Sequence, residues 1–254
     1  MDYIRGIFSL LWKLYIGLIF VVTAIIFYPI IVPFLFNENA KRKAFRLFVV
    51  WSWTVRICCF YFVNRLSKNE LPKGPYIIVA NHASYLDIFL IYSIVPREPF
   101  IFLGKIEILS YPLIKTYFKR FNIPVDRGSL VKSAKSLIVS GKKVKDGWSL
   151  MIFPEGGIPD ENNPKMTPFK EGAFQLAKNL NVPIVPITFM NNYRLLSDPS
   201  DVFGPASPGI IKVHIHPYFS VEEIENMTQK ELTSACFDRI NAPILKEFPE
   251  FKEC

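Results

Sequence analysis

Cysteine is scarce in this sequence, and its placement excludes two common uses of the residue. The chain has four cysteines, Cys58, Cys59, Cys236 and Cys254. No pair has the spacing of zinc ligands and no framework of spaced bridges is present, so a reducing compartment fits the sequence. Cys58 or Cys59 as a nucleophile would need a base, but no histidine lies near them in the sequence. We interpret both as buried apolar filler.

Charged residues are absent from a long stretch near the N-terminus. Residues 14–36 contain none, and at helical rise this stretch is about 34 Å long, enough to cross the hydrocarbon core of a bilayer. A signal peptide does not fit, because the stretch is too long for its apolar region and no small-residue cleavage site follows. Pro29 and Pro33 are expected to kink the second half of this membrane helix.

Apolar residues and positive charge are both in excess. Hydrophobic residues make up 50% of the chain, and Lys and Arg outnumber Asp and Glu by 30 to 22, giving a net charge of +8. This charge indicates an anionic partner such as membrane lipid, a phosphorylated substrate or nucleic acid. The apolar excess favours lipid over nucleic acid.

A second apolar run, residues 44–63, follows the basic cluster 41–43 and carries Arg56. A guanidinium at the centre of a bilayer costs about 3 kcal/mol even on lenient scales, so we expect a hairpin or an interfacial helix here. The positive-inside rule does not select an orientation by itself. A hairpin that enters and returns on one face would leave the basic clusters, and the active site, on the cytoplasmic side of the membrane.

A turn-rich linker at residues 67–75 divides the sequence into a membrane-embedded helical hairpin, 1–66, and an α/β domain, 67–254. In the domain, strand-like runs alternate with helical patterns, which predicts a mixed, largely parallel sheet flanked by helices. The predicted strands are 76–80, 99–103, 121–125, 149–153, 184–189 and 210–215, and the clearest helices are 129–145, 171–179 and 228–248.

A histidine follows directly after the first predicted strand of the domain. His82 is followed five positions later by Asp87, a spacing at which the two side chains diverge on a continuous helix or strand. They meet only at a corner where the strand stops near Ala80 and a helix begins close to Ser84. An aspartate bonded to one ring nitrogen would leave the other to take a proton from a substrate hydroxyl. A capping turn with a solvated Asp87 is the competing interpretation.

Three further clusters lie at predicted strand ends or turns. Arg127 follows a strand-like run, where its planar fork suits a phosphate. Glu155 precedes Gly156 and Gly157, and glycines there let backbone amides approach an anion or a polyol. Prolines repeat within the run 182–187, which excludes an ordinary central strand and predicts a strand that lines a pocket at the sheet margin.

These clusters, in this order, resemble the sequence blocks of the glycerolipid acyltransferase family, the lysophosphatidic acid acyltransferases and their relatives. The resemblance covers about residues 76–190, and any one block alone is weak. The matching positions are Asn81, His82 and Asp87 in the first block, 121–127 in the second, 153–156 in the third and 182–186 in the fourth.

The resemblance implies a mechanism and a set of substrates. His82 would be the general base, Asp87 its orienting partner, and the hydroxyl would attack an acyl thioester without an acyl-enzyme. No bound cofactor or metal is implied, and the co-substrate would be acyl-CoA or acyl carrier protein. The partners would be a lysolipid acceptor and the bilayer, with no nucleic acid.

The acceptor would be held by four further residues, again by resemblance. Arg127 would bind its phosphate, with Lys105 as a second contact, and Glu155 with Gly156 would position the glycerol part. The family commonly has Thr or Ser and then Arg after the third block, whereas Gly157 and Ile158 follow here. Lys105, Arg127 and the amides around Gly156 would replace the missing arginine, or the acceptor carries a different head group.

The leading expectation is therefore a membrane-bound O-acyltransferase that makes phosphatidic acid from lysophosphatidic acid. Another lysophospholipid, or a lyso form of an amino-acid-containing lipid, is the alternative acceptor. A lipid hydrolase is a remote alternative, because the chain contains no Gly-x-Ser-x-Gly elbow. A non-catalytic membrane scaffold would have little use for a base, its partner and a phosphate-binding arginine together.

Overall fold

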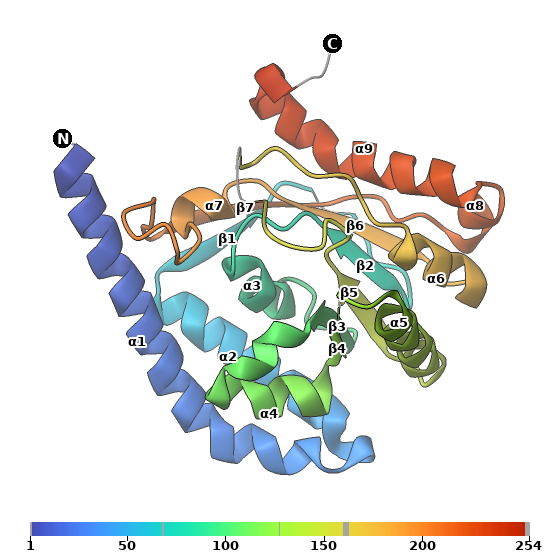
Figure 1. Ribbon diagram of the computed structural model, residues 1–254, viewed down its shortest axis with the longest axis horizontal. Coiled ribbons are helices and arrows are strands. Elements are labelled where there is room, and N and C mark those ends of the chain that lie inside the picture. The colour runs from blue at the N-terminus through green and yellow to red at the C-terminus, as the bar shows by residue number, and fades with distance from the viewer. Residues whose placement is uncertain (1, 68, 127, 160–162, 252–254) are drawn as a thin grey trace.

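The computed structural model describes residues 2–67, 69–126, 128–159 and 163–251. A long helix, α1 (Asp2–Leu35), forms one flank of the molecule, and the chain turns back through the short helix η1 (Glu38–Ala40) into α2 (Lys41–Cys58) (Figure 1). Over Tyr3–Leu35, α1 is the one helix among the described residues that is long and apolar enough to cross a membrane. Half of its large apolar side chains are exposed, and they recur at helical spacing along one side from Tyr3 to Ile30.

A sheet of seven strands follows, in the order β1-β7-β6-β2-β5-β3-β4. All neighbouring strands are parallel except β6 and β7. The strands are β1 (Tyr61–Arg65), β2 (Ile77–Ala80), β3 (Phe100–Lys105), β4 (Ile123–Val125), β5 (Ser149–Ile152), β6 (Ile184–Phe189) and β7 (Gly209–Ile215). The predicted fold class, a mixed and largely parallel sheet flanked by helices, is confirmed.

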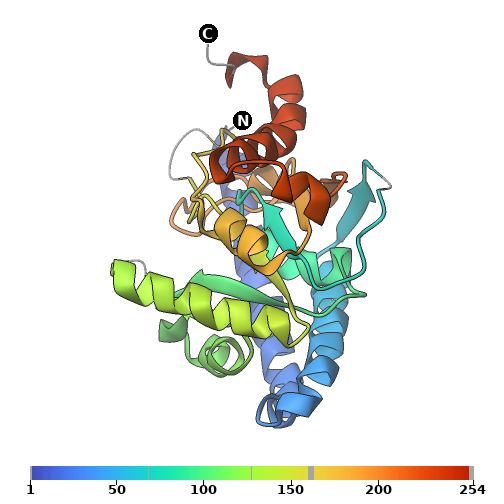
Figure 2. The same cartoon turned by 90° about the vertical axis from the view of Figure 1, so that its right-hand side faces the viewer.

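Helices cover both faces of this sheet (Figures 1 and 2). In the layer on one face, α5 contacts β5, α6 contacts β2 and α9 contacts β6, and in the layer on the other face α1, α2, α3 and α4 pack together. The remaining elements are α3 (Leu86–Ile94), η2 (Ile106–Ser110), α4 (Pro112–Phe121), α5 (Leu130–Lys145), α6 (Gly172–Leu180), α7 (Asn192–Leu195), α8 (Val221–Glu225), α9 (Gln229–Glu247) and η3 (Pro249–Phe251).

The strands β2, β3, β5 and β6 run in the same direction, and this decides where chemistry can occur. Their carboxyl ends meet at one edge of the sheet, the usual location of ligand sites in α/β folds. β2 lies between β5 and β6 and is fully buried along its length. The segments that follow β2, β5 and β6 are therefore brought together at the centre of this edge.

Two expectations about strands differ from the structure. Residues 61–65, placed by the sequence within the membrane hairpin, form β1 and pair with β7 from Gly209 onward. The strand with repeated prolines is not at the margin, because β6 lies between β7 and β2. Pro186 is tolerated there because it stands just outside the paired residues of β6 and β7, where its carbonyl still accepts from the His216 amide at 3.0 Å.

The second helix, α2, packs against the domain with the face that carries Arg56. This side chain is buried, and its guanidinium donates to the Ser93 hydroxyl at 3.0 Å and approaches the Tyr61 carbonyl at 3.4 Å. The charge that argued against a lone span thus bonds to groups of the α/β domain. The first half of α1 is tied to the loop after α7 by Ser9, which accepts from the Ala206 amide, and by Lys13, which donates to Ser197 at 2.8 Å.

Candidate active site

The corner predicted between Ala80 and Ser84 is present at the carboxyl end of β2. β2 ends at Ala80, and α3 begins at Leu86. The Asn81 side chain fixes the turn, because it accepts from the Phe189 amide at 2.8 Å and donates to the Phe189 carbonyl at 3.0 Å. The end of β2 is thereby fastened to the end of β6.

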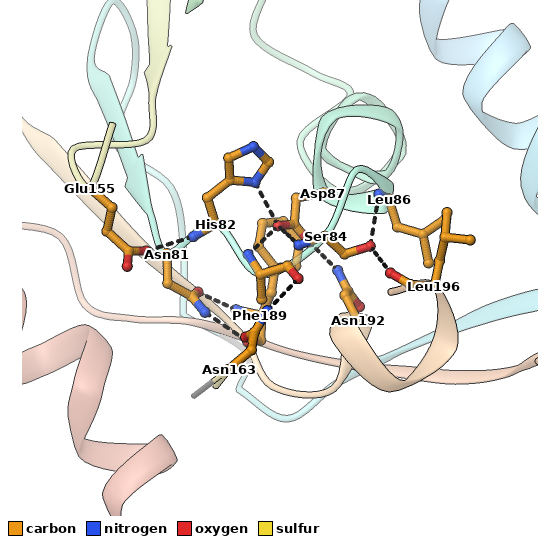
Figure 3. Close-up of polar contacts among 11 residues, drawn as sticks. Asn81, His82, Ser84, Leu86, Asp87, Glu155, Asn163, Phe189, Asn192 and Leu196 are labelled. Carbon is orange, nitrogen blue, oxygen red and sulfur yellow. Dashed lines mark hydrogen bonds and ion pairs between the residues drawn. The ribbon is translucent and has the colours of Figure 1, made fainter. Parts of the chain in front are cut away.

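This corner brings His82 and Asp87 into contact (Figure 3). The distance between His82 Nδ1 and Asp87 Oδ2 is 2.9 Å. Asp87 Oδ2 also accepts from the amides of Ala83 at 2.8 Å and Ser84 at 3.0 Å. Because two amides also donate to this oxygen, it acts as an acceptor, and His82 Nδ1 is the donor in the third bond. The competing interpretation, a solvated Asp87, is excluded because this side chain is fully buried.

The His82 ring is held in one plane, and one of its two nitrogens points away from Asp87. It stacks on Phe153 with ring centroids 4.0 Å apart and an interplanar angle of 13°. Its side chain keeps 11% of its surface exposed, whereas Asp87 keeps none. With Nδ1 protonated and bonded, Nε2 is the acceptor, and it points away from Asp87 (Figure 3). The arrangement can therefore accept a proton from a group that approaches from solvent.

The Glu155 carboxylate bonds to the backbone of His82. Its Oε1 accepts from the His82 amide at 2.8 Å, and its Oε2 accepts from the Thr167 amide at 2.8 Å and hydroxyl at 3.2 Å. Burial raises the pKa of this carboxyl, while the bonds from Thr167 and His82 act in the opposite direction. Glu155 thus holds the backbone of His82, a role that the sequence did not indicate.

Gly156 closes the turn after β5. Its φ of 91° lies in the left-handed region that favours glycine. Its amide donates to the Phe153 carbonyl at 3.1 Å, so the expectation that this amide is open to an anion is wrong. The turn itself aims the Phe153 ring at His82.

The side-chain amine of Lys105 lies near the same turn. It is the last residue of β3 and is exposed, and its Nζ lies 3.2 Å from the point where a Cβ on Gly157 would stand. The structure therefore brings Lys105 to the loop that carries Glu155. Arg127, the expected phosphate ligand, lies outside the described residues.

Asn192 belongs to the site and has no sequence signal. It begins α7, directly beyond β6, and its Nδ2 donates to Asp87 Oδ1 at 2.5 Å. No recognisable block contains it, and 105 positions separate it from Asp87. Thr167 escaped notice for a similar reason, because a lone threonine in a loop is not informative.

Two further observations concern the described residues outside the His82–Asp87 pair. A cleft of about 690 Å³ lies between the loop 165–171 and α9, and it shares Thr167 with the site but neither His82 nor Asp87. Within the described ranges, no group of three or more His, Cys, Asp or Glu side chains could hold a metal ion.

Comparison with known proteins identifies the family. The family model described as Acyltransferase matches residues 62–190, about half of the chain. The chain belongs to the acyltransferase family. The predicted resemblance is confirmed, and the matched range contains every residue that the sequence assigned to the site.

Curated members of this family are similar to the chain over part of their length. The chloroplastic 1-acyl-sn-glycerol-3-phosphate acyltransferase BAT2 of Brassica napus is 30% identical over 188 residues, which cover 72% of this chain and 53% of that protein. The 1-acyl-sn-glycerol-3-phosphate acyltransferase of Saccharomyces cerevisiae is 34% identical over 166 residues, covering 58% and 52% respectively. The chain spans about half the length of these relatives.

A solved structure of the family has the same fold. The crystal structure of PlsC, the 1-acyl-sn-glycerophosphate (LPA) acyltransferase from Thermotoga maritima, superposes with a TM-score of 0.78. The alignment covers 96% of this chain and 98% of that one, at 22% sequence identity. The likeness extends over the amino-terminal helices as well as the sheet.

Proposed function

We propose that this protein transfers a fatty acyl group from an acyl thioester to the free hydroxyl of lysophosphatidic acid, giving phosphatidic acid. The observation that carries the proposal is the 2.9 Å contact between His82 Nδ1 and Asp87 Oδ2, which leaves the second ring nitrogen as a base. The activity for which the Brassica napus and Saccharomyces cerevisiae relatives are named supports the same reaction.

The reaction needs one proton to move twice. The acceptor hydroxyl gives its proton to His82 Nε2 while its oxygen attacks the carbonyl carbon of the thioester. Asp87 stabilises the imidazolium that forms. When the tetrahedral intermediate collapses, the carbon–sulfur bond breaks and the leaving thiolate takes the proton from His82. The acyl group passes directly to the acceptor oxygen, so no covalent acyl-enzyme forms.

Acceptor binding is assigned to cations and to the turn after β5. Lys105 and Arg127 bind the phosphate, and Glu155 with Gly156 position the glycerol part, Glu155 by fixing the His82 backbone as well. The position of Lys105 Nζ beside Gly157 supports this assignment. Gly157 and Ile158 supply no further cation, which supports another lysophospholipid or a lyso-aminolipid as the second candidate acceptor.

The acceptor reaches the site from a membrane. The exposed apolar side of α1 supports a bilayer location, and the bonds from Ser9 and Lys13 connect α1 to the loop after α7. We place the site on the cytoplasmic face, where acyl-CoA or acyl carrier protein supplies the thioester. No nucleic acid takes part.

The test is an acceptor panel. Protein purified in detergent is given a labelled acyl thioester and lysolipids that differ in head group, and the products are identified by mass spectrometry. We expect phosphatidic acid to form fastest. His82→Ala should abolish transfer and Asp87→Asn should slow it by about 100-fold or more, whereas His214→Ala, a change on β7, should leave the rate unaltered. Undiminished transfer by His82→Ala would overturn the mechanism, and transfer to water alone would indicate a hydrolase.

A further inference from the structure

Asp87 receives its bonds from two different parts of the chain. Its Oδ2 accepts from His82, Ala83 and Ser84, all within the same corner. Its Oδ1 accepts from Asn192, which belongs to α7. Figure 3 shows His82 and Asn192 on opposite sides of the Asp87 carboxylate. The orientation of this carboxylate is therefore set by a residue outside the corner.

We propose that Asn192 is a positioning residue for the reaction, holding Asp87, and through it the His82 ring, in the orientation that proton transfer requires. The inference rests on the proposed function, because it assigns a role within that mechanism. Asn192 does not touch His82 in any contact that the structure records, so its influence passes through the Asp87 carboxylate.

The second polar atom of Asn192 points to the same role. Asn192 is fully buried, and its Oδ1 has no hydrogen-bond partner among the described residues. Exchanging the amide nitrogen and oxygen would direct a carbonyl oxygen at the Asp87 carboxylate, so the bond to Asp87 fixes the amide orientation. An unpaired buried acceptor costs stability, and an apolar side chain would avoid that cost. What an apolar side chain lacks is the donor for Asp87.

Asn192 is itself held firmly in place. The preceding Asn191 donates to the Ile210 carbonyl at 2.9 Å and accepts from the Lys212 amide at 2.8 Å, which fastens the start of α7 to β7. At the other end, the Ser84 hydroxyl donates to the Leu196 carbonyl at 2.6 Å. The helix α7 is thus a short brace between β7 and the corner, and it presents Asn192 to Asp87 at a fixed distance.

The test compares two substitutions at one position. Asn192→Leu removes the donor, and Asn192→Asp keeps the shape but donates only when the introduced carboxyl is protonated. We expect kcat to fall about 10- to 100-fold in Asn192→Leu, the effect of losing a bond to a charged group, with KM changed less than about twofold because Asn192 does not contact substrate. For Asn192→Asp, the rate relative to the unaltered protein should rise as the pH is lowered.

The matched control is Thr188→Val. Thr188 is equally buried and bonds to His216 and Ile240 but not to Asp87, so this change should lower the melting temperature without lowering kcat. An unchanged kcat in Asn192→Leu, a kcat loss of the same size in Thr188→Val, or no recovery of Asn192→Asp at low pH would each overturn the proposal.

A second readout separates this inference from the proposed function. The chain has three histidines, so the proton on His82 Nδ1 can be assigned in a ¹⁵N-histidine NMR spectrum by comparison with His82→Ala. We expect its downfield signal in the unaltered protein and its loss in Asn192→Leu. If the protein transferred no acyl group to any lysolipid, the proposed function would fail, and this signal would still decide whether Asn192 positions the pair. Persistence of the signal in Asn192→Leu would overturn the inference.

Discussion

The carboxylate of Glu155 joins the two loops that enclose His82. One oxygen accepts from the His82 amide and the other from Thr167, so both loops depend on acceptors at this one side chain. A neutral amide has only one acceptor oxygen, and its nitrogen would face a backbone donor in either orientation. The residue is therefore sensitive to loss of charge even though the substitution hardly changes its size.

We predict that Glu155→Gln lowers kcat by about tenfold and destabilises the fold by about 1–3 kcal/mol, the cost of a buried donor left unpaired. Steady-state kinetics and urea unfolding would measure the two effects. Glu171→Gln is the matched control, because Glu171 is exposed and its carboxylate bonds to the Gln229 side chain. Equal behaviour of the two variants would show that Glu155 does not hold His82 in place.

We predict that Lys105→Ala and Arg127→Ala each raise KM for lysophosphatidic acid by about tenfold, the loss of one bond to a charged group, with a small effect on kcat. A lysolipid whose phosphate is shielded by a further head group should be affected less. Initial rates across both acceptors would measure this difference. Lys145→Ala, an exposed change on α5, serves as the control, and equal losses for both acceptors would contradict the phosphate assignment.

The sequence was sufficient for some site residues and insufficient for others, for a physical reason. His82, Asp87 and Glu155 lie at strand ends inside short blocks, so local spacing reveals them. Asn192 acts on Asp87 across 105 positions, and only the pairing of β2 with β6 brings the two together. A contact that depends on the order of strands in the sheet leaves no pattern among neighbouring residues of the sequence.

Among the elements, β1 is the one whose assignment changed most. The apolar run 44–63 was interpreted as one segment, but α2 ends at Cys58 and β1 begins at Tyr61. Apolar periodicity does not mark this break, because both elements are apolar and no turn-rich stretch separates them. The strands β2 to β7 were recognised because glycine, proline or charged residues separate them from the neighbouring elements. Pro186 misled the placement of β6, since its missing donor is harmless just beyond the residues that pair β6 with β7.

We predict that Asn64→Pro destabilises the protein more than Val63→Pro. The Leu66 amide donates to the Val213 carbonyl, and because hydrogen bonding alternates along a strand, the Asn64 amide also faces β7 while that of Val63 faces outward. Asn64→Pro therefore loses a ladder bond, worth about 1 kcal/mol, that Val63→Pro keeps. Thermal melting would measure the difference. Equal melting temperatures would mean that β1 contributes no ladder to the sheet.

For the molecule as a whole, one half-buried histidine links stability to pH. His216 Nε2 lies 2.8 Å from Thr188 Oγ1, and this hydroxyl donates to the Ile240 carbonyl, so His216 is the donor in their bond. Burial, with smaller contributions from His214 and Arg239, lowers the pKa of His216 to about 4. The folded protein therefore keeps this imidazole neutral at a pH where the unfolded chain protonates it.

We predict that stability is lost as the pH falls from about 6.5, the usual pKa of histidine, to about 4. In this window the unfolded state binds the extra proton, and the loss reaches about 3 kcal/mol at most. Urea unfolding as a function of pH would measure it. His216→Gln keeps a donor for Thr188 and does not titrate, so its stability should vary less over this window. An identical pH profile in both proteins would contradict the assignment.

Because β1 pairs with β7, the sheet cannot be completed until most of the chain has been synthesised. Tyr61 lies opposite Gly209, a residue near the far end of the chain. A ribosome releases α1 and β1 long before β7 exists, and pairings between such distant segments form slowly. The apolar helix has therefore left the ribosome, and can enter a bilayer, while the sheet still lacks its edge. The sheet is therefore completed only after α1 has become available to a bilayer.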